Sequence, residues 1–490
     1  MKKIIPCLLM LSGIQSAIGN QQSAMGRPNI LLITTDDQGL DVGCYGNPLA
    51  RTPNLDQLAK EGVRFTRAYV TQASCSPSRS SILTGLYPHQ NGQFGLTNDY
   101  SMHEGVETLP TMLKKAGYRT GIIGKLHVNP ESAFPFDFWE IKSPVQTRHV
   151  RNVNAEAQKF IEASGGNPFF LMVNFFDPHD PYDALANQCD GLPEKPYKPE
   201  DIRPMDFIGV DVPELRKDIA IYYNCIERAD AGIGLLMKML QDRGLEKNTL
   251  VIFLSDNGPR FTRAKVSSYE AGVQVPFIVR RPQADAAGKV CDALVSSVDI
   301  VPTILELVGV KTETALPGRS LLPLLDNPSA AWRATLSTDY TAHRKEHYYP
   351  SRAIRTVRYK LIHNMLPERI NPFSGMGAVR SLDASAPAKN GAIYNAVNPD
   401  FYSDKNRFFG GSAESIRTAY ATYRNPPEFE LYDLEKDPHE RSNLAGNPEY
   451  ASTLAELKTG LAVWQKETAD PFADPGYLKK FTAQTDALCK

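Results

Sequence analysis

The sequence lacks the features that define several large classes of protein. Beyond its N-terminal segment it has no apolar run long enough to cross a bilayer, which argues against a transmembrane protein. Its 54 basic and 55 acidic residues nearly cancel, so no bulk charge attracts nucleic acid or a membrane surface, and a polyanionic substrate would need local attraction. It contains no internal repeat and no low-complexity tract. With 42% hydrophobic and 22% charged residues, it has the composition of an ordinary globular protein.

Cysteine is also scarce and irregularly spaced. Two of the seven cysteines are set apart, since Cys7 lies in an N-terminal apolar run and Cys75 lies in the motif described below. The others are Cys44, Cys189, Cys225, Cys291 and Cys489. This odd number predicts no disulfide scaffold, and no pair has the spacing of zinc ligands.

The first 19 residues have the order of a secretory signal peptide: Lys2 and Lys3, an apolar run, then the small residues Ala17 and Gly19. We therefore expect export to a periplasm or beyond. The 490 residues exceed one simple core, so we expect a large catalytic domain over residues 26–350 and a smaller subdomain over residues 351–490.

Three apolar stretches end in polar residues and are typical of buried strands of an α/β sheet. NILLITTDDQG ends in Asp36 and Asp37, NTLVIFLSDNG ends in Asp256 and Asn257, and NPFFLMVNFFDPHDPY ends near His179. Ligands of such sheets bind outside the carboxyl ends of the strands. An isolated Asp-Asp pair is as often a solvated turn, but three strands of this kind are hard to explain as independent turns. The four oxygen-bearing residues suit Ca²⁺.

The rest of the chain reads as further sheet and helix. RTGIIGKLHV predicts a short strand followed by Lys125 and His127, and residues 213–245 predict a long helix whose periodicity only Gly232 and Gly234 interrupt. From Ser351 the alternation in RAIRTVRYKLIHN and in FELYDLEKDPHERSNLA predicts exposed antiparallel strands on either side of a polar loop over residues 367–424. A final helix follows from residue 451.

The stretch CSPSRSSILTG, from Cys75 to Gly85, carries the most specific signal. Pro77 and the serines around it predict a helix that begins near Ser78, with Cys75 just before its N-terminus. The helix dipole would lower the pKa of the thiol there and favour a bound anion. A buried cysteine beside a helix cap is the plain alternative.

This stretch resembles the C-x-P-S-R motif, followed by T-G, of the type I sulfatases, in which the cysteine is oxidised to Cα-formylglycine. Residues 265–276 resemble the family block K-x-x-x-Y-E-G-G-x-R-x-P, but Ala271 replaces the first glycine and Gln274 replaces the arginine. The two departures place local substrate contacts in doubt. The resemblance implies an α/β, alkaline phosphatase-like fold, with a large mixed sheet sandwiched by helices and a smaller C-terminal α+β subdomain that carries an antiparallel sheet.

The resemblance also implies roles for individual residues. The Ca²⁺ ligands would be Asp36, Asp37, Asp256, Asn257 and the modified Cys75. Arg79 would orient the hydrated formylglycine, one oxygen of which attacks sulfur while the other later expels sulfate. Lys125, Lys265 and His179 would bind sulfate oxygens and protonate the leaving group, and His127 would support the base step.

Within the family, YPSRAIRTVRYKLIHN and neighbouring segments look most like the N-sulfoglucosamine sulfohydrolases, or sulfamidases. Against this, Lys265 stands where sulfamidases carry arginine. His343, Arg344 and Arg352 lie in the segment that reaches the pocket in that family, so we expect them to contact a glycan. Exposed loop charges are the alternative.

The resemblance implies a sulfated glycan as substrate and a formylglycine-generating or anaerobic sulfatase-maturing enzyme as partner. It predicts neither nucleic acid binding nor an oligomeric state. An O-sulfatase is the alternative within the family. A phosphatase or phosphodiesterase would have serine or threonine as its nucleophile, and a non-catalytic glycan-binding protein would be expected to have lost metal or catalytic positions.

Overall fold

The structure is a computed structural model that describes residues 27–180, 190, 194–282, 287–374 and 412–489. The expected signal peptide and Cys189 lie outside these residues. No helix in the described part of the chain is both long and apolar enough to cross a membrane.

The strands are β1 (Asn29–Thr35), β2 (Val63–Tyr69), β3 (Arg119–Gly124), β4 (Phe138–Glu140), β5 (Phe169–Asn174), β6 (Thr249–Ser255), β7 (Phe277–Arg280), β8 (Lys289–Ser296), β9 (Leu336–Tyr340), β10 (Ser351–Arg355), β11 (Tyr359–Asn364) and β12 (Phe429–Asp433). The α-helices are α2 (Pro53–Glu61), α3 (Cys75–Thr84), α4 (Pro88–Asn91), α5 (Leu109–Lys115), α6 (Val150–Ala163), α7 (Pro213–Asp242), α8 (Glu270–Val273), α9 (Ile300–Val308), α10 (Leu322–Asp326), α12 (Glu414–Arg424), α13 (Ala451–Glu467) and α14 (Pro475–Leu488).

The large domain is built on an eight-stranded sheet of order β4-β3-β5-β1-β6-β7-β2-β8. β1 pairs in parallel with β5 and with β6, and β5 pairs in parallel with β3, whereas β7 runs antiparallel to β6 and β2. The carboxyl ends of β3, β5, β1 and β6 therefore meet at one edge of the sheet. All seven residues of β1 are buried, as its continuous apolar run predicts for a central parallel strand.

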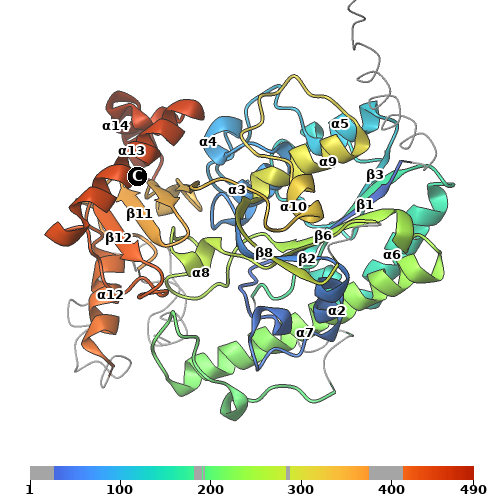
Figure 1. Cartoon of the computed structure of the whole chain (residues 1–490), viewed down its shortest axis with the longest axis horizontal. Coiled ribbons are helices and arrows are strands. Elements are labelled where there is room, and N and C mark those ends of the chain that lie inside the picture. The colour runs from blue at the N-terminus through green and yellow to red at the C-terminus, as the bar shows by residue number, and fades with distance from the viewer. Residues whose placement is uncertain (1–26, 181–189, 191–193, 283–286, 375–411, 490) are drawn as a thin grey trace, which may run out of the picture.

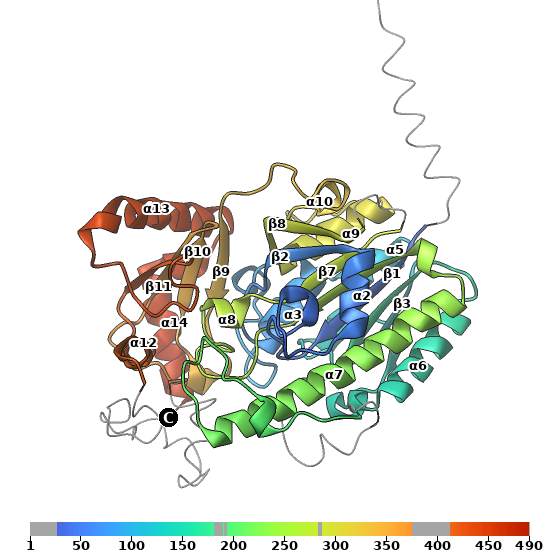
Figure 2. The same ribbon diagram turned by 60° about the horizontal axis from the view of Figure 1, so that its bottom comes forward.

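Helices cover both faces of this sheet, which confirms the predicted sandwich (Figures 1 and 2). Ile30 and Leu32 of β1 belong to one core, which includes Met112 of α5 and residues of α9. The alternate residues Leu31 and Ile33 belong to a second core with residues of α2, α6 and α7. This division follows from the strand geometry, because successive side chains point to opposite faces.

A second, four-stranded antiparallel sheet of order β12-β11-β10-β9 lies on one side of the large domain (Figure 1). It includes β9, so it begins at Leu336, ahead of the boundary expected at Ser351. Its strands were predicted to be exposed, and this was wrong, because all five residues of β10 are buried. Ile354 and Leu361 pack against Leu457 and Leu461 of α13, which covers one face of this sheet.

One helix differs from the prediction and another confirms it. α3 begins at Cys75, three residues earlier than expected, so the cysteine occupies the first turn instead of preceding it. α7 runs without a break through Gly232 and Gly234. A Cβ atom at Gly232 would come within 2.5 Å of the ring of Phe175, so close packing accounts for this glycine. The polar segment over residues 367–424 ends in a helix, α12, while residues 375–411 lie outside the described chain.

Candidate functional site

The acidic ends of β1 and β6 meet, because these two strands are neighbours in register. The backbone N–H of Asp37 donates to Asp256 Oδ1 at 3.1 Å, and Asn257 Nδ2 donates to Asp37 Oδ1 at 2.7 Å. The structure thus brings together Asp36, Asp37, Asp256 and Asn257, each of which is fully buried.

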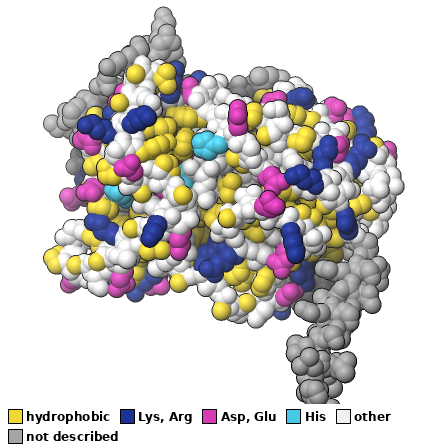
Figure 3. Space-filling model, turned by 90° about the horizontal axis from the view of Figure 1, so that it is seen from above, with side chains coloured by type: hydrophobic (Ala, Val, Ile, Leu, Met, Phe, Trp, Pro, Cys, Tyr) yellow, Lys and Arg dark blue, Asp and Glu magenta, His cyan; other side chains and the backbone are white. Residues whose placement is uncertain are grey.

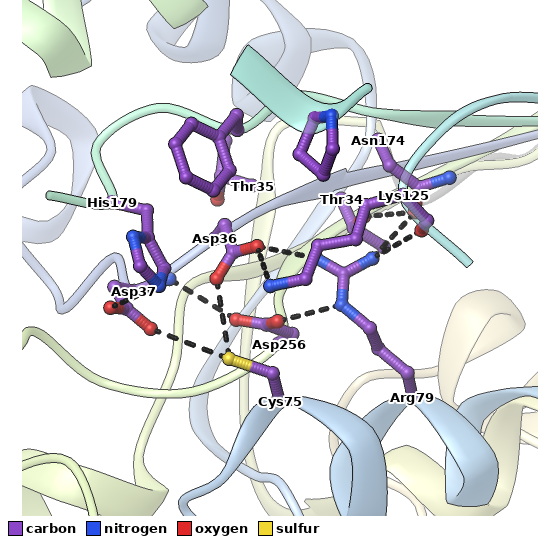
Figure 4. Close-up of polar contacts among 12 residues, drawn as sticks. Thr34, Thr35, Asp36, Asp37, Cys75, Arg79, Lys125, Asn174, His179 and Asp256 are labelled. Carbon is purple, nitrogen blue, oxygen red and sulfur yellow. Dashed lines mark hydrogen bonds and ion pairs between the residues drawn. The ribbon is translucent and has the colours of Figure 1, made fainter. Parts of the chain in front are cut away.

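Cys75 faces these carboxylates from the first turn of α3 (Figure 4). The residue is 2% exposed, and its thiol lies 3.5 Å from Asp36 Oδ1 and 4.0 Å from Asp37 Oδ1. Lys265 Nζ lies 3.1 Å from the sulfur. Ser74 occupies the N-cap position, but its side chain does not cap the helix and instead hydrogen-bonds to His343 Nδ1 at 2.9 Å.

Arg79 follows one helical turn after Cys75 and ties the strand ends together (Figure 4). Its guanidinium donates to Asp256 at 2.8 Å, to Asp36 at 3.3 Å, to the carbonyl oxygen of Lys125 at 3.0 Å and to Asn174 Oδ1 at 2.9 Å. Burial alone would lower the pKa of Arg79, but the charges of Asp256 and Asp36 outweigh it and raise this pKa. Arg79 is therefore a fixed positive charge beneath the site. Asn174, the polar last residue of the apolar strand β5, was not predicted to take part.

Three cations balance the three buried carboxylates. Besides Arg79, Lys125 Nζ lies 2.6 Å from Asp36 Oδ2, and Lys265 Nζ lies 2.5 Å from Asp37 Oδ1. Burial would raise the pKa of Asp36, but these cations, with Lys125 first among them, hold it well below its ordinary value. Burial raises the pKa of Asp256, and the charge of Asp36 adds to the shift. The site thus contains several ionised groups at close quarters, which a protein keeps only when they are paired.

Three predicted histidines surround the same space. Burial, together with the charge of Lys125, lowers the pKa of His127 well below its ordinary value. Burial and the charge of Lys265 do the same for His343. His127 and His343 are consequently neutral near pH 7, so each has a ring nitrogen that can accept a proton. His179 lies with Nε2 3.6 Å from Asp37 Oδ2.

These groups open into a cavity of about 400 Å³, a volume suited to a small polar ligand. Seven of the predicted site residues line it: Cys75, Lys125, His127, His179, Lys265, His343 and Arg344. Eight further lining residues were not predicted: Leu96, Asn98, Arg260, Phe261, Thr262, Val266, Phe373 and Tyr423. The latter come from loops and from α12, a helix within the segment that was predicted to be a polar loop. Arg260, Phe261 and Thr262 carried a signal, since they lie between the predicted residues Asn257 and Lys265 in the sequence.

The prediction that Arg352 contacts a glycan was wrong. Arg352 is fully buried and does not line the cavity. Its guanidinium donates to Asp470 at 2.7 and 3.0 Å and packs over the ring of Phe472. The hydrogen bonds and the stacked ring account for its burial, since a buried charge needs such partners.

The two departures from the family block also lie away from this cavity. Gln274 donates to the carbonyl oxygen of Thr66, and both Ala271 and Gln274 line a separate hollow that also involves Glu270 and Glu440. The doubt that they raised about substrate contacts therefore does not extend to the cavity around Cys75.

The donor atoms at the strand ends fit a hard cation. Asp36, Asp37, Cys75 and His179 each place one ligand atom within 4.8 Å of the others. In addition, Asp37 Oδ2 and Asn257 Oδ1 are buried without a hydrogen-bond partner, so two oxygen atoms remain available for a ligand. These two atoms and the carboxylate oxygens of Asp36 and Asp256 form an oxygen-rich set of the kind that Ca²⁺ prefers, to which the thiol and the imidazole do not belong.

Comparison with known proteins agrees with this geometry. A sulfatase family model matches residues 28–310, and a model of the C-terminal region of N-sulphoglucosamine sulphohydrolase matches residues 263–371. Human N-sulphoglucosamine sulphohydrolase is 36% identical over 487 residues, which cover 92% of this chain and 93% of that protein. An ulvan-active sulfatase of Formosa agariphila is 30% identical over 91% of this chain and 81% of its own.

Solved structures share the fold. One, described as a complex with its substrate D-glucosamine-2-N,6-O-disulfate, has a TM-score of 0.66 at 24% identity and covers 91% of this chain and 98% of its own. The phosphonate monoester hydrolase of Agrobacterium radiobacter has a TM-score of 0.65 at 19% identity, with coverage of 90% and 96%. The alkaline phosphatase-like fold is thereby confirmed. Because the family model spans more than half of the chain and several relatives align over most of their length, the protein is an enzyme of the sulfatase family.

Proposed function

We propose that this sulfatase releases sulfate from N-sulfoglucosamine of a heparan-type glycan. The observation that carries the reaction is the position of Cys75, which lines the cavity and lies beside Asp36, Asp37 and Lys265. The sugar is suggested by the relative that aligns over nearly the whole chain and by the match to the sulphohydrolase C-terminal region.

The proposal includes Ca²⁺, held by Asp36, Asp37, Asp256 and Asn257. The two unpartnered oxygen atoms of Asp37 and Asn257 support this assignment. The ion would supply positive charge beside a sulfate oxygen and acidify the attacking hydroxyl group. The proposal also includes oxidation of Cys75 to formylglycine by a maturing enzyme, and export directed by the N-terminal segment.

Residues that line or support the cavity would carry out the separate steps of the reaction. Lys125 and Lys265 both line the cavity and would neutralise charge on the sulfate oxygens. Arg79 would fix the orientation of residue 75 through the strand-end carboxylates. His179 would protonate the departing nitrogen or oxygen, and His127, whose Nδ1 has no hydrogen-bond partner, would accept a proton when the intermediate collapses.

An O-sulfatase acting on glucosamine is the second candidate. The observation that favours it is Lys265, which stands where the sulfamidases carry arginine. The remaining alternatives are weaker. The likeness to a phosphonate monoester hydrolase extends to the fold alone, and every position expected of a catalytic site is occupied, which does not favour a non-catalytic glycan-binding protein.

The experiment is to incubate the matured enzyme with glucosamine N-sulfate and with glucosamine 6-O-sulfate, and to measure inorganic sulfate. Faster release from the N-sulfate supports the proposal. Faster release from the 6-O-sulfate overturns the assignment of the substrate and leaves the sulfatase reaction intact. The Cys75→Ala variant serves as the blank for both substrates.

A further inference from the structure

His179 is held by the residue that follows it in the chain. Its Nδ1 lies 2.5 Å from the carbonyl oxygen of Asp180 and 3.0 Å from the carboxylate Oδ1 of the same residue. One face of the imidazole ring stacks on the ring of Phe176, with 4.6 Å between the ring centroids. The imidazole is therefore fixed at one nitrogen and along one face, while Nε2 remains directed toward Asp37 and the cavity.

This arrangement determines which nitrogen carries the fixed hydrogen. A carbonyl oxygen can only accept, so Nδ1 must donate, and proton exchange with a substrate is left to Nε2. The carboxylate Oδ1 of Asp180 makes no aligned hydrogen bond of its own, although it lies beside Nδ1. It is thus available to accept from Nδ1–H if the ring turns slightly as a ligand enters.

The Asp180 carboxylate is in turn held by a residue from a distant part of the chain. Arg260, in the loop after β6, donates to Asp180 Oδ2, although 80 residues separate the two. The loop after β5, which carries His179, is thereby connected to the loop that carries Arg260 and Lys265. Both Arg260 and His179 line the cavity.

We infer that Asp180 is a positioning residue for His179, and that Arg260 keeps its carboxylate in place. The main-chain carbonyl oxygen of Asp180 accepts the Nδ1 hydrogen, and its carboxylate adds a negative charge 3.0 Å from the same nitrogen, so the proton that reaches the leaving group comes from Nε2. When the bond from sulfur to the leaving atom breaks, its electron pair stays on that atom, which then takes this proton. The inference rests on the proposed role of His179 and does not depend on which sugar is the substrate.

The test uses the matured full-length enzyme and a series of aryl sulfates whose phenols range from strongly to weakly acidic. A good leaving group departs without a proton, whereas a poor one needs it. Asp180→Ala removes the carboxylate beside Nδ1 but keeps the main-chain carbonyl that accepts its hydrogen. We therefore expect kcat/KM to fall by a factor of about 10 for the poorest leaving group and by less than about 3 for 4-nitrophenyl sulfate. Asp180→Asn, whose amide oxygen can still accept from Nδ1–H, should recover part of this loss and covers the case in which the alanine variant does not fold.

The control is Arg260→Gln, which cuts the connection between the loops but leaves the carboxylate next to Nδ1. It should show a smaller loss in the same direction. An equal loss for every substrate in the series, or no loss in Asp180→Ala, would overturn the inference. Failure of the wild-type enzyme to release sulfate from either glucosamine derivative would affect only the proposed substrate. The aryl sulfates measure the dependence of kcat/KM on the leaving group without any sugar.

Discussion

The Nζ atom of Lys265 lies 3.1 Å from the Sγ atom of Cys75, although 190 residues separate the two in the chain. The same ammonium group lies 2.5 Å from Asp37 Oδ1, and burial would lower its pKa were it not for the charge of Asp37, which raises it. Lys265 is therefore a permanent cation beside the atom at which sulfate would be bound.

Removal of this cation should slow the reaction strongly. For Lys265→Ala we expect a loss of about 100- to 1,000-fold in kcat/KM for sulfate release, because a preorganised charge next to the developing charge is lost. Lys265→Arg keeps the charge and should retain more activity than the alanine variant. A loss of less than about 3-fold in Lys265→Ala would show that the lysine does not act on the sulfate group.

Chelation should remove activity if the strand-end oxygens hold Ca²⁺. Activity should be lost on dialysis against a chelator and return on addition of Ca²⁺. Ligand binding to the native state should also raise the free energy of unfolding by about 2.7 kcal/mol at a Ca²⁺ concentration 100 times Kd. Thermal unfolding with and without Ca²⁺ measures this in the inactive Cys75→Ala protein as well. The Asp256→Asn variant should show a smaller gain, and an equal gain would contradict the ligand assignment.

A buried pair of glutamates predicts a pH effect on stability remote from the site. Burial raises the pKa of Glu440 to about 7, an effect that Lys360 opposes and Glu270 reinforces. Because this pKa lies above the ordinary value of 4.5, the native state binds the proton more tightly than the unfolded chain does. The resulting stability is fully present below about pH 4.5 and is lost as the pH rises through about 7.

We therefore expect the free energy of unfolding of the wild type to fall between pH 5 and 8 relative to that of Glu440→Gln, by up to about 1.4 kcal/mol per pH unit. Urea unfolding of both proteins at several pH values measures this difference in the free energy of unfolding. Glu435→Gln, at an exposed position of the same loop, serves as the control and should follow the wild type. Parallel curves for the wild type and Glu440→Gln would contradict the shifted pKa.

Substitution of Arg352 should lower the stability of the protein, whereas substitution of Arg344 should weaken substrate binding. Arg352→Met leaves the buried carboxylate of Asp470 without its ion-pair partner, which should lower the free energy of unfolding by roughly 3–5 kcal/mol. The KM of this variant should stay within about 2-fold of the wild-type value, because the Arg352 side chain does not line the cavity.

Arg344 lines the cavity with its side chain 45% exposed. Arg344→Ala should raise KM and leave the unfolding transition almost unchanged. If Arg352→Met instead raised KM without destabilising the protein, the assignment of Arg352 to the core beside the four-stranded sheet would be wrong.

Much of the site was predictable because it depends on strand ends. Apolar runs that end in Asp36 and in Asp256 mark parallel central strands, and parallel neighbours necessarily bring their carboxyl ends together. Neither apolar run indicates that β1 pairs with β6. Any strand order that makes these two parallel strands neighbours would, however, bring the same oxygen atoms together.

Other features depended on contacts that no local pattern records. Arg352 occupies a strand whose alternating pattern predicts one exposed face. Only the packing of α13 and of the segment around Asp470 shows that the face with Arg352 and Ile354 is covered. Asn98, Phe373 and Tyr423 line the cavity from segments far apart in the chain, so their convergence is a property of the tertiary fold.

The central claim is that residue 75 performs the chemistry, and sulfate release by the wild type and by Cys75→Ala measures it most directly. Both proteins should be produced together with a maturing enzyme and compared on glucosamine N-sulfate and on 4-nitrophenyl sulfate, after their thermal unfolding has been matched. We predict sulfate release by the wild type and none above the blank by Cys75→Ala on either substrate. Sustained release by a folded Cys75→Ala protein would contradict the claim.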